Sequence, residues 1–506
     1  MARTSRIAGG SNALTGETEI LPDYIRRDNE TGKVDFSQAD LTLPASGAAA
    51  ISQITGLTAA LAGKADSSHS HVESDVTGLT AALAGKADLA DPRLTFPALR
   101  VAPVNYGNES LITNLSDGTD TGCNTLRYHG LSTFNFYGNI RLVYANFDAN
   151  YNLGEDASVV GTITIAGASF RRALDATYMR VTFNNGSHTV SVPAGGVVIS
   201  DPLPTILPSN TPMRSRTYIT VSGGVKWGGQ RAIVSGSPEY ECCTHSTSES
   251  DQSQTGTIDT TGTVPWGPIA VLFEGVDENI LTVWGYGDAC MAGVGDTTHI
   301  GWFGRAFWGQ TNVLAWRASV YAELALSFRQ YCGQARIRTS VGARVGICGY
   351  GYNDLVNGRT LAQLQGDVIA IWLAMDARGQ KVYQTTSRPK TTSTDSWATV
   401  ENQTPFAYES VRVQFNAWVR DSAPVTEVTL APVATGNTDS TTIRAGDTGH
   451  PLTGYIDLAS AVESSLNSGK WIAGSTIDGE HPDATRHAAI AALVDLSALR
   501  TEVGVS

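Results

Sequence analysis

The sequence predicts a multidomain protein in which three patterns follow one another along 506 residues. A repeat with apolar residues spaced three and four apart predicts short helical repeats over residues 46–93. Apolar and polar residues then alternate between turn signals, which predicts an antiparallel β-sandwich, jelly-roll-like, over residues 94–265. From residue 266 to 506, strand patterns alternate with helix patterns and predict an α/β domain.

The composition limits the classes of function. Hydrophobic residues make up 42% of the chain and charged residues 16%, as in an ordinary globular protein. The net charge of −13 argues against a broad basic surface for nucleic acid. No apolar run approaches the roughly 18 residues of a membrane-spanning helix, and the N-terminus lacks the apolar core of a secretory signal. The six cysteines lack paired metal-type spacing, and we interpret them as reduced thiols.

The helical repeat is the stretch TGLTAALAGKAD, which occurs at 55–66 and unchanged at 77–88. Its apolar positions are Ile54, Leu57 and Leu61 in the first copy, and Val76, Leu79 and Leu83 in the second. Such a stripe on a helix can be buried only between two or more chains. Because GKAD breaks each helix and the period of 22 residues is not a multiple of seven, we expect two short bundles rather than one long coiled coil.

This repeat resembles those in the shafts of bacteriophage tail fibres, and the resemblance covers about 40 residues. It implies a homotrimer within a virion, with residues 1–45 as the segment that attaches to the tail or baseplate. His69 and His71 lie between the two copies. In a trimer they would place six imidazoles around the axis, where iron or another first-row metal could bind. The alternative is a solvated polar turn between the bundles.

The predicted sandwich rests on alternating stretches such as 138–147, 159–170, 179–192 and 216–224, which are separated by Gly, Asn, Asp and Pro. Nothing in these stretches gathers acids, bases or metal ligands. We therefore expect this domain to be a scaffold, a trimer contact or a carbohydrate-binding surface.

The α/β domain is predicted from strands at 278–287, 343–351 and 380–387 and from helical periodicity at 312–332 and 358–379. This order favours a parallel sheet wrapped by helices. Ligands bind such sheets at the carboxyl ends of the strands. The stretches GYGDAC and GYGYND, which follow two of the strands, are therefore expected at one rim.

Three motifs occur in an informative order: GYGDAC at 285–290, GYND at 351–354 and DGEH at 478–481. Together they resemble the SGNH, or GDSL, hydrolases, which are esterases of flavodoxin-like α/β fold with their nucleophile serine in G-D-S. The resemblance spans roughly residues 266–500. It implies that His481 takes the nucleophile's proton and that Asp478 orients the imidazole. It also implies an oxyanion hole formed by Asn353 and the N–H of residue 289.

Two departures from the family pattern matter. In the family, a glycine in the second sequence motif supplies a third oxyanion donor. This glycine has no clear counterpart here, and Arg317, Ala318 or Ser319 would have to replace it. We assign Ala318. The nucleophile position holds Ala289. The neighbouring Cys290 is not expected to replace the serine, because its side chain points elsewhere in a strand-to-helix turn; Ser319 stays an alternative, although nothing in the sequence places it beside His481. We interpret the chain as an inactivated Ser→Ala form of an otherwise complete site; the rival is a natural pseudo-esterase that only binds glycan.

Aromatic residues crowd this region, and we expect most to be core, with one or two lining the cleft. They are Trp284, Tyr286, Trp302, Phe303, Phe307, Trp308 and Trp316. The resemblances together imply a phage receptor-binding tail fibre or tailspike that removes O-acetyl groups from host surface polysaccharide, either O-antigen or capsule. Catalysis would need no cofactor, and no nucleic acid or membrane insertion is expected. The alternatives are a non-catalytic glycan-binding fibre and a secreted bacterial esterase.

Overall fold

The structure is a computed structural model that describes residues 114–505 with short gaps. The gaps are 132–133, 151–153, 157–159, 173–174, 176, 210, 230–241, 259–264, 275–278, 297–299, 333–335, 338–339 and 341. Before residue 114 it describes the strands β1 to β7 alone. The helical repeats predicted over residues 46–93, with His69 and His71, lie outside the described residues. The chain divides into two compact units, Met1–Ala81 and Ala82–Ser506.

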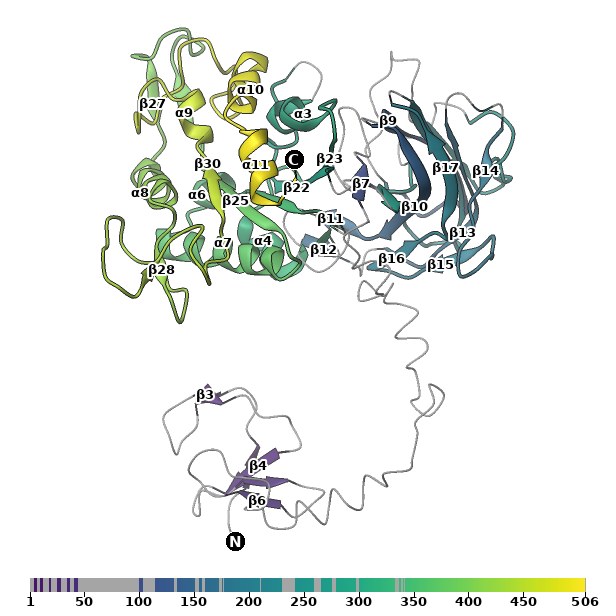
Figure 1. Cartoon of the computed structure of the whole chain (residues 1–506), viewed down its shortest axis with the longest axis horizontal. Coiled ribbons are helices and arrows are strands. Elements are labelled where there is room, and N and C mark those ends of the chain that lie inside the picture. The colour runs from purple at the N-terminus through teal and green to yellow at the C-terminus, as the bar shows by residue number, and fades with distance from the viewer. Residues whose placement is uncertain are drawn as a thin grey trace. The chain divides into compact units, whose positions relative to one another are not determined.

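The first unit contains a small antiparallel sheet in the order β1-β4-β5-β6, which Figure 1 shows in purple. Its strands are β1 (Thr4–Arg6), β4 (Ile25–Asp28), β5 (Val34–Phe36) and β6 (Leu41–Leu43), and a separate pair joins β2 (Gly10–Ser11) to β3 (Thr18–Glu19). These strands fall in the segment that we predict to attach to the virion, where the sequence pattern carried no strand signal.

The predicted β-sandwich is present as two antiparallel sheets. The first has the order β16-β10-β21-β7, with β17 also paired to β10, and the second has the order β14-β13-β18-β9-β20, with β15 paired to β13. The first sheet consists of β7 (Arg100–Ala102), β10 (Phe136–Asn146), β16 (Gly196–Ile199), β17 (Leu203–Leu207) and β21 (Ala270–Glu274). The second consists of β9 (Gly122–Leu131), β13 (Ile163–Arg172), β14 (Met179–Arg180), β15 (Val190–Val192), β18 (Pro212–Thr220) and β20 (Cys242–Ser246).

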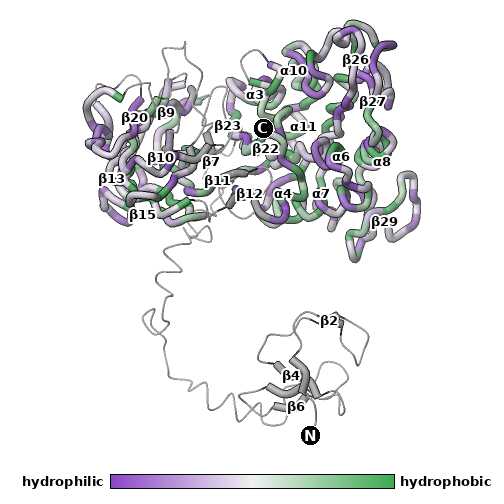
Figure 2. Tube along the Cα trace, turned by 180° about the vertical axis from the view of Figure 1, so that it is seen from behind, coloured by the Kyte–Doolittle hydropathy of each residue, from purple (hydrophilic) through white to green (hydrophobic). Residues whose placement is uncertain are grey.

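The alternation in the sequence corresponds to burial in these sheets. Buried and partly exposed residues alternate without exception along β18, because successive side chains point to opposite faces of a sheet. Figure 2 shows the same interleaving of hydrophilic and hydrophobic residues along the sandwich strands. Two short pairs complete this part: β8 (Asn114–Leu115) with β19 (Gly228–Gly229), and β11 (Asp148–Asn150) with β12 (Gly154–Asp156). Because β21 pairs with β10, the sandwich extends to Glu274, beyond the predicted boundary at residue 265.

The α/β domain contains a five-stranded parallel sheet in the order β23-β22-β24-β25-β30. In chain order this is 2-1-3-4-5, the flavodoxin-like arrangement that we expected. The strands are β22 (Leu281–Gly287), β23 (Val313–Ser319), β24 (Val345–Gly349), β25 (Lys381–Thr385) and β30 (Gly454–Ile456). Every residue of β22 and β23 is buried, as is usual for a parallel sheet with both faces covered.

Helices cover both faces of this sheet (Figure 1). They are α3 (Gly301–Phe307), α4 (Ala325–Ser327) with the π-helix η3 (Phe328–Cys332), α6 (Tyr352–Val356), α7 (Leu361–Asp376), α8 (Glu409–Arg420), α9 (Leu458–Val462), α10 (Ala484–Ala491) and α11 (Leu496–Glu502). Two hairpins project from the domain: β26 (Thr391–Ser393) with β27 (Gln403–Pro405), and β28 (Val425–Thr426) with β29 (Thr442–Ile443).

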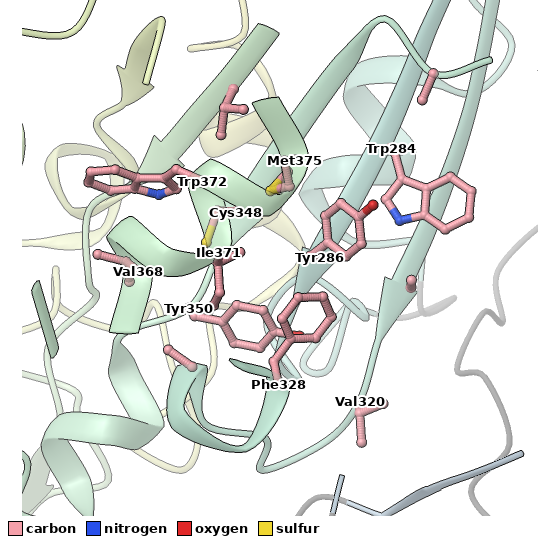
Figure 3. Close-up of a cluster of buried hydrophobic side chains, with 14 of the residues drawn as sticks. Trp284, Tyr286, Val320, Phe328, Cys348, Tyr350, Val368, Ile371, Trp372 and Met375 are labelled. Atoms are coloured by element: carbon pink, nitrogen blue, oxygen red, sulfur yellow. The ribbon is translucent and has the colours of Figure 1, made fainter. Parts of the chain in front are cut away.

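The longest helix illustrates how the sequence determines these elements. The Thr360 side chain caps α7 by accepting from the Gln363 N–H, and the Gln363 side chain accepts from the Thr360 N–H. Its buried face includes Val368, Ile371, Trp372 and Met375, which Figure 3 shows facing Tyr286 and Cys348 of the sheet and Tyr350 just after β24. On the opposite face of the sheet, Leu281, Val283 and Ile347 pack against α3, α9 and α10.

The helix predicted over residues 312–332 is wrong in its first half. Val313–Ser319 forms the strand β23, and helical structure begins only at Ala325. The reason is that all seven residues of β23 are buried, the polar Arg317 and Ser319 included, so neither face is marked by exposed polar residues. A short run that is buried on both faces cannot be assigned to helix or strand from its periodicity.

Candidate active site

Ala289 lies in the turn that follows the first strand of the α/β sheet. β22 ends at Gly287, and the Ala292 N–H donates to Asp288 O at 3.0 Å. The Val294 N–H donates to Ala289 O, also at 3.0 Å, so the chain makes a helix-like turn beyond the strand. Ala289 is 8% exposed. The position predicted for the nucleophile therefore carries a methyl group.

Cys290 and Ser319, the two other candidates with a nucleophilic atom, are both buried. Cys290 is 2% exposed and packs in the core with Trp302. Burial raises the pKa of its thiol to about 12, so the reactive thiolate is scarce at neutral pH. Ser319 is completely buried, opposite Gly287 in the sheet.

Asp478 and His481, which the sequence predicts to be an acid–base pair, lie in hydrogen-bond contact. The His481 Nδ1 lies 2.7 Å from Asp478 Oδ2. The other carboxylate oxygen, Oδ1, accepts the N–H groups of Glu480 and His481, both at 2.8 Å. Burial opposes ionisation of Asp478, but these hydrogen bonds prevail and hold its pKa well below the usual value. An ionised Asp478 fixes the proton on Nδ1 and leaves Nε2 to accept one.

The loop that carries Asp478 and His481, which we call the histidine loop, packs directly against the turn that carries Ala289. At Gly295, whose φ is +93°, an added Cβ would lie 2.2 Å from Pro482 O and 3.3 Å from the His481 Cβ. No side chain fits between the two segments at this point. His481 is therefore held next to the segment that contains the nucleophile position.

A second histidine, His487 on α10, forms hydrogen bonds with the same turn and with the start of α3. Its Nδ1 accepts from the Trp302 N–H at 3.0 Å, and its Nε2 donates to Val294 O at 3.0 Å. Burial lowers the pKa of His487 to about 4. The imidazole is therefore neutral at pH 7, as both bonds require.

Asn353 brings the third strand end to the site. It follows β24, on the first turn of α6, and its Nδ2 donates to Glu323 O at 3.0 Å. The same nitrogen lies 3.3 Å from Asp288 Oδ2, which is a long contact. The turn after β22, the turn after β23 and the start of α6 thus meet at one rim of the sheet, as the strand order requires.

Ala318 lies inside β23, in register with Tyr286 of β22, and is completely buried. Its carbonyl accepts from Arg336 Nη1 at 3.1 Å. The turn from Val320 to Glu323 follows the strand and lies beside Asn353 through the Glu323 carbonyl. This turn is better placed than Ala318 for a third oxyanion donor.

Arg388 is a buried residue of the site that the sequence analysis missed. Its Nη1 donates to Asp288 Oδ2 at 3.0 Å, and its Nε donates to Glu480 O at 2.6 Å. Its guanidinium also lies 3.7 Å from the centre of the Tyr352 ring. Arg388 therefore joins the nucleophile turn, the histidine loop and α6. Its position just after β25 could have indicated a place at the rim.

The hairpin of β26 and β27 supports the histidine loop from outside. Gly479 has φ +74°, and a Cβ there would lie 2.1 Å from Thr391 O and 2.8 Å from the Trp397 ring. The Thr391 N–H donates to Gly479 O at 3.1 Å, and Trp397 Nε1 donates to Thr391 Oγ1 at 2.9 Å. No sequence motif indicated Trp397, because this contact joins segments about 80 residues apart.

The aromatic residues are mostly core, as expected. Six are buried: Trp284, Tyr286, Trp302, Phe303, Phe307 and Trp316. Trp308 is partly exposed, and the Arg317 guanidinium lies 4.7 Å from its ring centre. Among the described residues, no group of three His, Cys, Asp or Glu side chains could hold a metal ion. No helix in this part of the chain is long and apolar enough to cross a membrane.

No protein-family model and no curated protein match the chain. Several solved structures have a similar fold. A GDSL-like lipase from Bacteroides thetaiotaomicron is 13% identical, with a TM-score of 0.29, over 44% of this chain and 88% of its own. A G-D-S-L family protein from Desulfitobacterium hafniense is 13% identical, with a TM-score of 0.30, over 43% and 98%.

A variant of an acetyl-xylooligosaccharide esterase from Geobacillus is 11% identical, with a TM-score of 0.30. The match covers 45% of this chain and 95% of the esterase. At these identities the likeness concerns the fold alone.

Proposed function

We propose that the α/β domain is an ester-hydrolysing site of the SGNH type that lacks only the nucleophile oxygen. The observation that supports this best is the 2.7 Å contact between His481 Nδ1 and Asp478 Oδ2, on a loop that packs against the turn of Ala289. An imidazole oriented by a carboxylate is the base that a serine nucleophile needs.

With serine at position 289, the reaction would proceed in two steps. The hydroxyl oxygen attacks the acyl carbon while its proton moves to His481 Nε2, and Asp478 stabilises the imidazolium. The tetrahedral intermediate then expels the sugar oxygen, which takes the proton from His481. Water attacks the acyl-enzyme by the same route and releases the carboxylic acid. These steps use the chain's own groups and need no cofactor.

The oxyanion would accept from the N–H of residue 289 and from Asn353 Nδ2. One Nδ2 hydrogen is held by Glu323 O at 3.0 Å. The other makes only the 3.3 Å contact with Asp288 and is the one that can turn to an oxyanion. Removing such a donor typically lowers kcat by roughly 10²–10³.

The wider proposal is that this site belongs to a bacteriophage tail fibre or tailspike that removes O-acetyl groups from a host's surface polysaccharide. It rests on the repeat TGLTAALAGKAD at 55–66 and 77–88 and on the site chemistry. The protein would be a homotrimer that acts at the host cell surface. Light scattering tests the assembly: three copies of the 53.5 kDa chain give about 160 kDa, and a monomer would contradict the fibre.

Ala289 itself supports a second candidate, a pseudo-esterase that binds glycan without cleaving it. The Ala289→Ser variant distinguishes the two. If the site is complete, the variant releases acetate from O-acetylated polysaccharide and from a small acetyl ester. The matched control carries Ala289→Ser together with His481→Ala and should lose roughly 10³-fold or more in activity. No release by the Ala289→Ser variant would leave the pseudo-esterase.

A further inference from the structure

The turn between β26 and β27 has an unusual backbone conformation. Ser396 and Trp397 have φ angles of +55° and +59°. Bulky side chains rarely adopt this left-handed region, because their Cβ crowds the backbone. Such conformations persist only where the surrounding structure fixes them, and they cluster at ligand-binding and active sites. The conformation of Trp397 therefore points to a role beyond support of the histidine loop.

The turn is fixed by hydrogen bonds of its own. Ser393 Oγ accepts from the N–H groups of Asp395 and Trp397, at 3.2 and 2.8 Å. The Asp395 carboxylate accepts from Thr399 Oγ1 and Ser393 Oγ, both at 2.7 Å. It also accepts from Asn402 Nδ2 at 3.0 Å. The bond from Thr399 and the others hold the pKa of Asp395 below its usual value. An ionised Asp395 therefore keeps the turn in one conformation at neutral pH.

Trp397 contacts the histidine loop on both sides of Ile477. Its carbonyl accepts from the Gly474 N–H at 2.7 Å, and a Cβ added at Gly479 would lie 2.8 Å from its ring. Trp397 is nevertheless partly exposed. Ile477 is 85% exposed and directly precedes Asp478. A single exposed apolar side chain is ordinary on a protein surface, but this one lies between two contacts of a partly exposed tryptophan and next to the carboxylate of the predicted acid–base pair.

The exposed polar side chains of this hairpin are mostly neutral. Within residues 391–402 they are Thr392, Thr394, Ser396, Thr399, Glu401 and Asn402, of which only Glu401 is charged. Two of these side chains hold Asp395, and the three remaining hydroxyls face solvent. Hydroxyls both donate and accept hydrogen bonds, as the hydroxyls of a sugar require. The surroundings of Trp397 therefore suit a neutral sugar better than a charged ligand.

We propose that Trp397 and Ile477 form a subsite for a neutral sugar ring of the substrate. The C–H face of the sugar would pack on the tryptophan ring and on Ile477, and its hydroxyls would bond to the polar side chains of the hairpin. Because the turn is already ordered, little conformational entropy is lost when the sugar binds. The ester-bearing sugar would lie at His481, and a neighbouring sugar would lie at Trp397.

This inference rests on the proposed function and specifies its substrate class: esters carried by a chain of neutral sugars, rather than small or lipid esters. The test is isothermal titration calorimetry of the full, unmodified chain with partially O-acetylated tetrasaccharides of glucose, xylose and mannose. Because position 289 carries no nucleophile, the ligand should stay intact during the measurement. We expect at least one of the three tetrasaccharides to bind.

Trp397→Ala should weaken this binding at least about tenfold, which corresponds to about 1.4 kcal/mol. Trp397→Phe keeps an aromatic face but loses the Nε1 bond to Thr391, and it should weaken binding by no more than about threefold. Ile477→Ser should weaken binding about threefold. Its matched control is Val428→Ser, in the loop between β28 and β29, where the side chain is 90% exposed. This control should bind like the unmodified chain.

Kinetics of the Ala289→Ser chain separate binding from mere support of the histidine loop. Adding Trp397→Ala should lower kcat/KM for the bound tetrasaccharide, mainly through KM, at least about tenfold more than for 4-nitrophenyl acetate. A supporting role alone would lower both equally, and that result would overturn the subsite. Failure of all three tetrasaccharides to bind, or equal binding by Trp397→Ala and the unmodified chain, would also overturn it. Loss of hydrolysis with binding intact would contradict the proposed function alone, so the two proposals fail separately.

Discussion

Replacing Arg388 by methionine should destabilise the α/β domain strongly while conserving most of the side-chain volume. The change removes the 3.0 Å ion pair with Asp288, the 2.6 Å hydrogen bond to Glu480 O and the contact with the Tyr352 ring. Arg388 and Asp288 are 4% and 2% exposed at their side chains. Methionine therefore leaves a buried carboxylate without its cation, and breaking such a pair costs about 3–5 kcal/mol.

Thermal unfolding followed by circular dichroism measures this cost. For a domain of this size, about 3–5 kcal/mol corresponds to a fall in Tm of roughly 6–20 °C. Adding Asp288→Asn to Arg388→Met should recover part of the loss, because it removes the uncompensated charge. The matched control is Lys381→Met, which breaks an ion pair with Glu502 whose side chains are 48% and 40% exposed. It should cost no more than about 1 kcal/mol.

The reasoning is refuted if Arg388→Met and Lys381→Met lower the Tm equally. It is also refuted if Asp288→Asn makes the Arg388→Met chain less stable rather than more. Either result would mean that the Asp288 carboxylate is not held by Arg388 in the folded protein.

Three further predictions follow from the site. Burial lowers the pKa of His487 to about 4. The contribution of His487 to stability is therefore complete above about pH 6.5 and falls by about 3 kcal/mol as the pH drops to 4. The Tm of a His487→Gln variant should vary less over this pH range, and an unchanged variation of Tm would contradict the assignment. Cys290, with its pKa raised to about 12, should react with iodoacetamide at pH 7.5 only after unfolding, as peptide mass spectrometry would show; rapid labelling of the folded chain would count against its burial. Gly479→Ala should disorder the histidine loop, because the added Cβ would lie 2.1 Å from Thr391 O at φ +74°. Gly474→Ala, at φ +69° with no atom within 4 Å of the added Cβ, is the matched control for backbone strain alone. Equal losses in Tm for the two variants would disprove the steric account.

The order of the motifs predicted which segments lie near one another, because two of the motifs follow strands that the sequence pattern reveals. The first two follow β22 and β24, and parallel strands bring their carboxyl ends to one rim. The spacing of three between Asp478 and His481 predicted their contact, because both lie on one short loop. This part of the site depends on local sequence alone.

The remaining parts depend on contacts that local sequence does not encode. Arg388 acts through Asp288, which is 100 residues earlier, and Trp397 acts through Gly479, on a different loop. The strand β23 looked helical because its surroundings, rather than its own pattern, bury both of its faces. Ala318 was assigned from the place of this stretch in the family's motif order, and its position inside β23 favours the turn after it instead.

The most direct test of the central claim is covalent labelling of the Ala289→Ser variant by a fluorophosphonate, followed by intact-mass and peptide mass spectrometry. Such a reagent reacts with a serine that an adjacent base activates, whatever the natural substrate. The account predicts one label per chain at position 289, none in the unmodified chain, and none when His481→Ala is added. An unlabelled Ala289→Ser variant, or labelling that survives His481→Ala, would contradict the claim that only the nucleophile oxygen is missing.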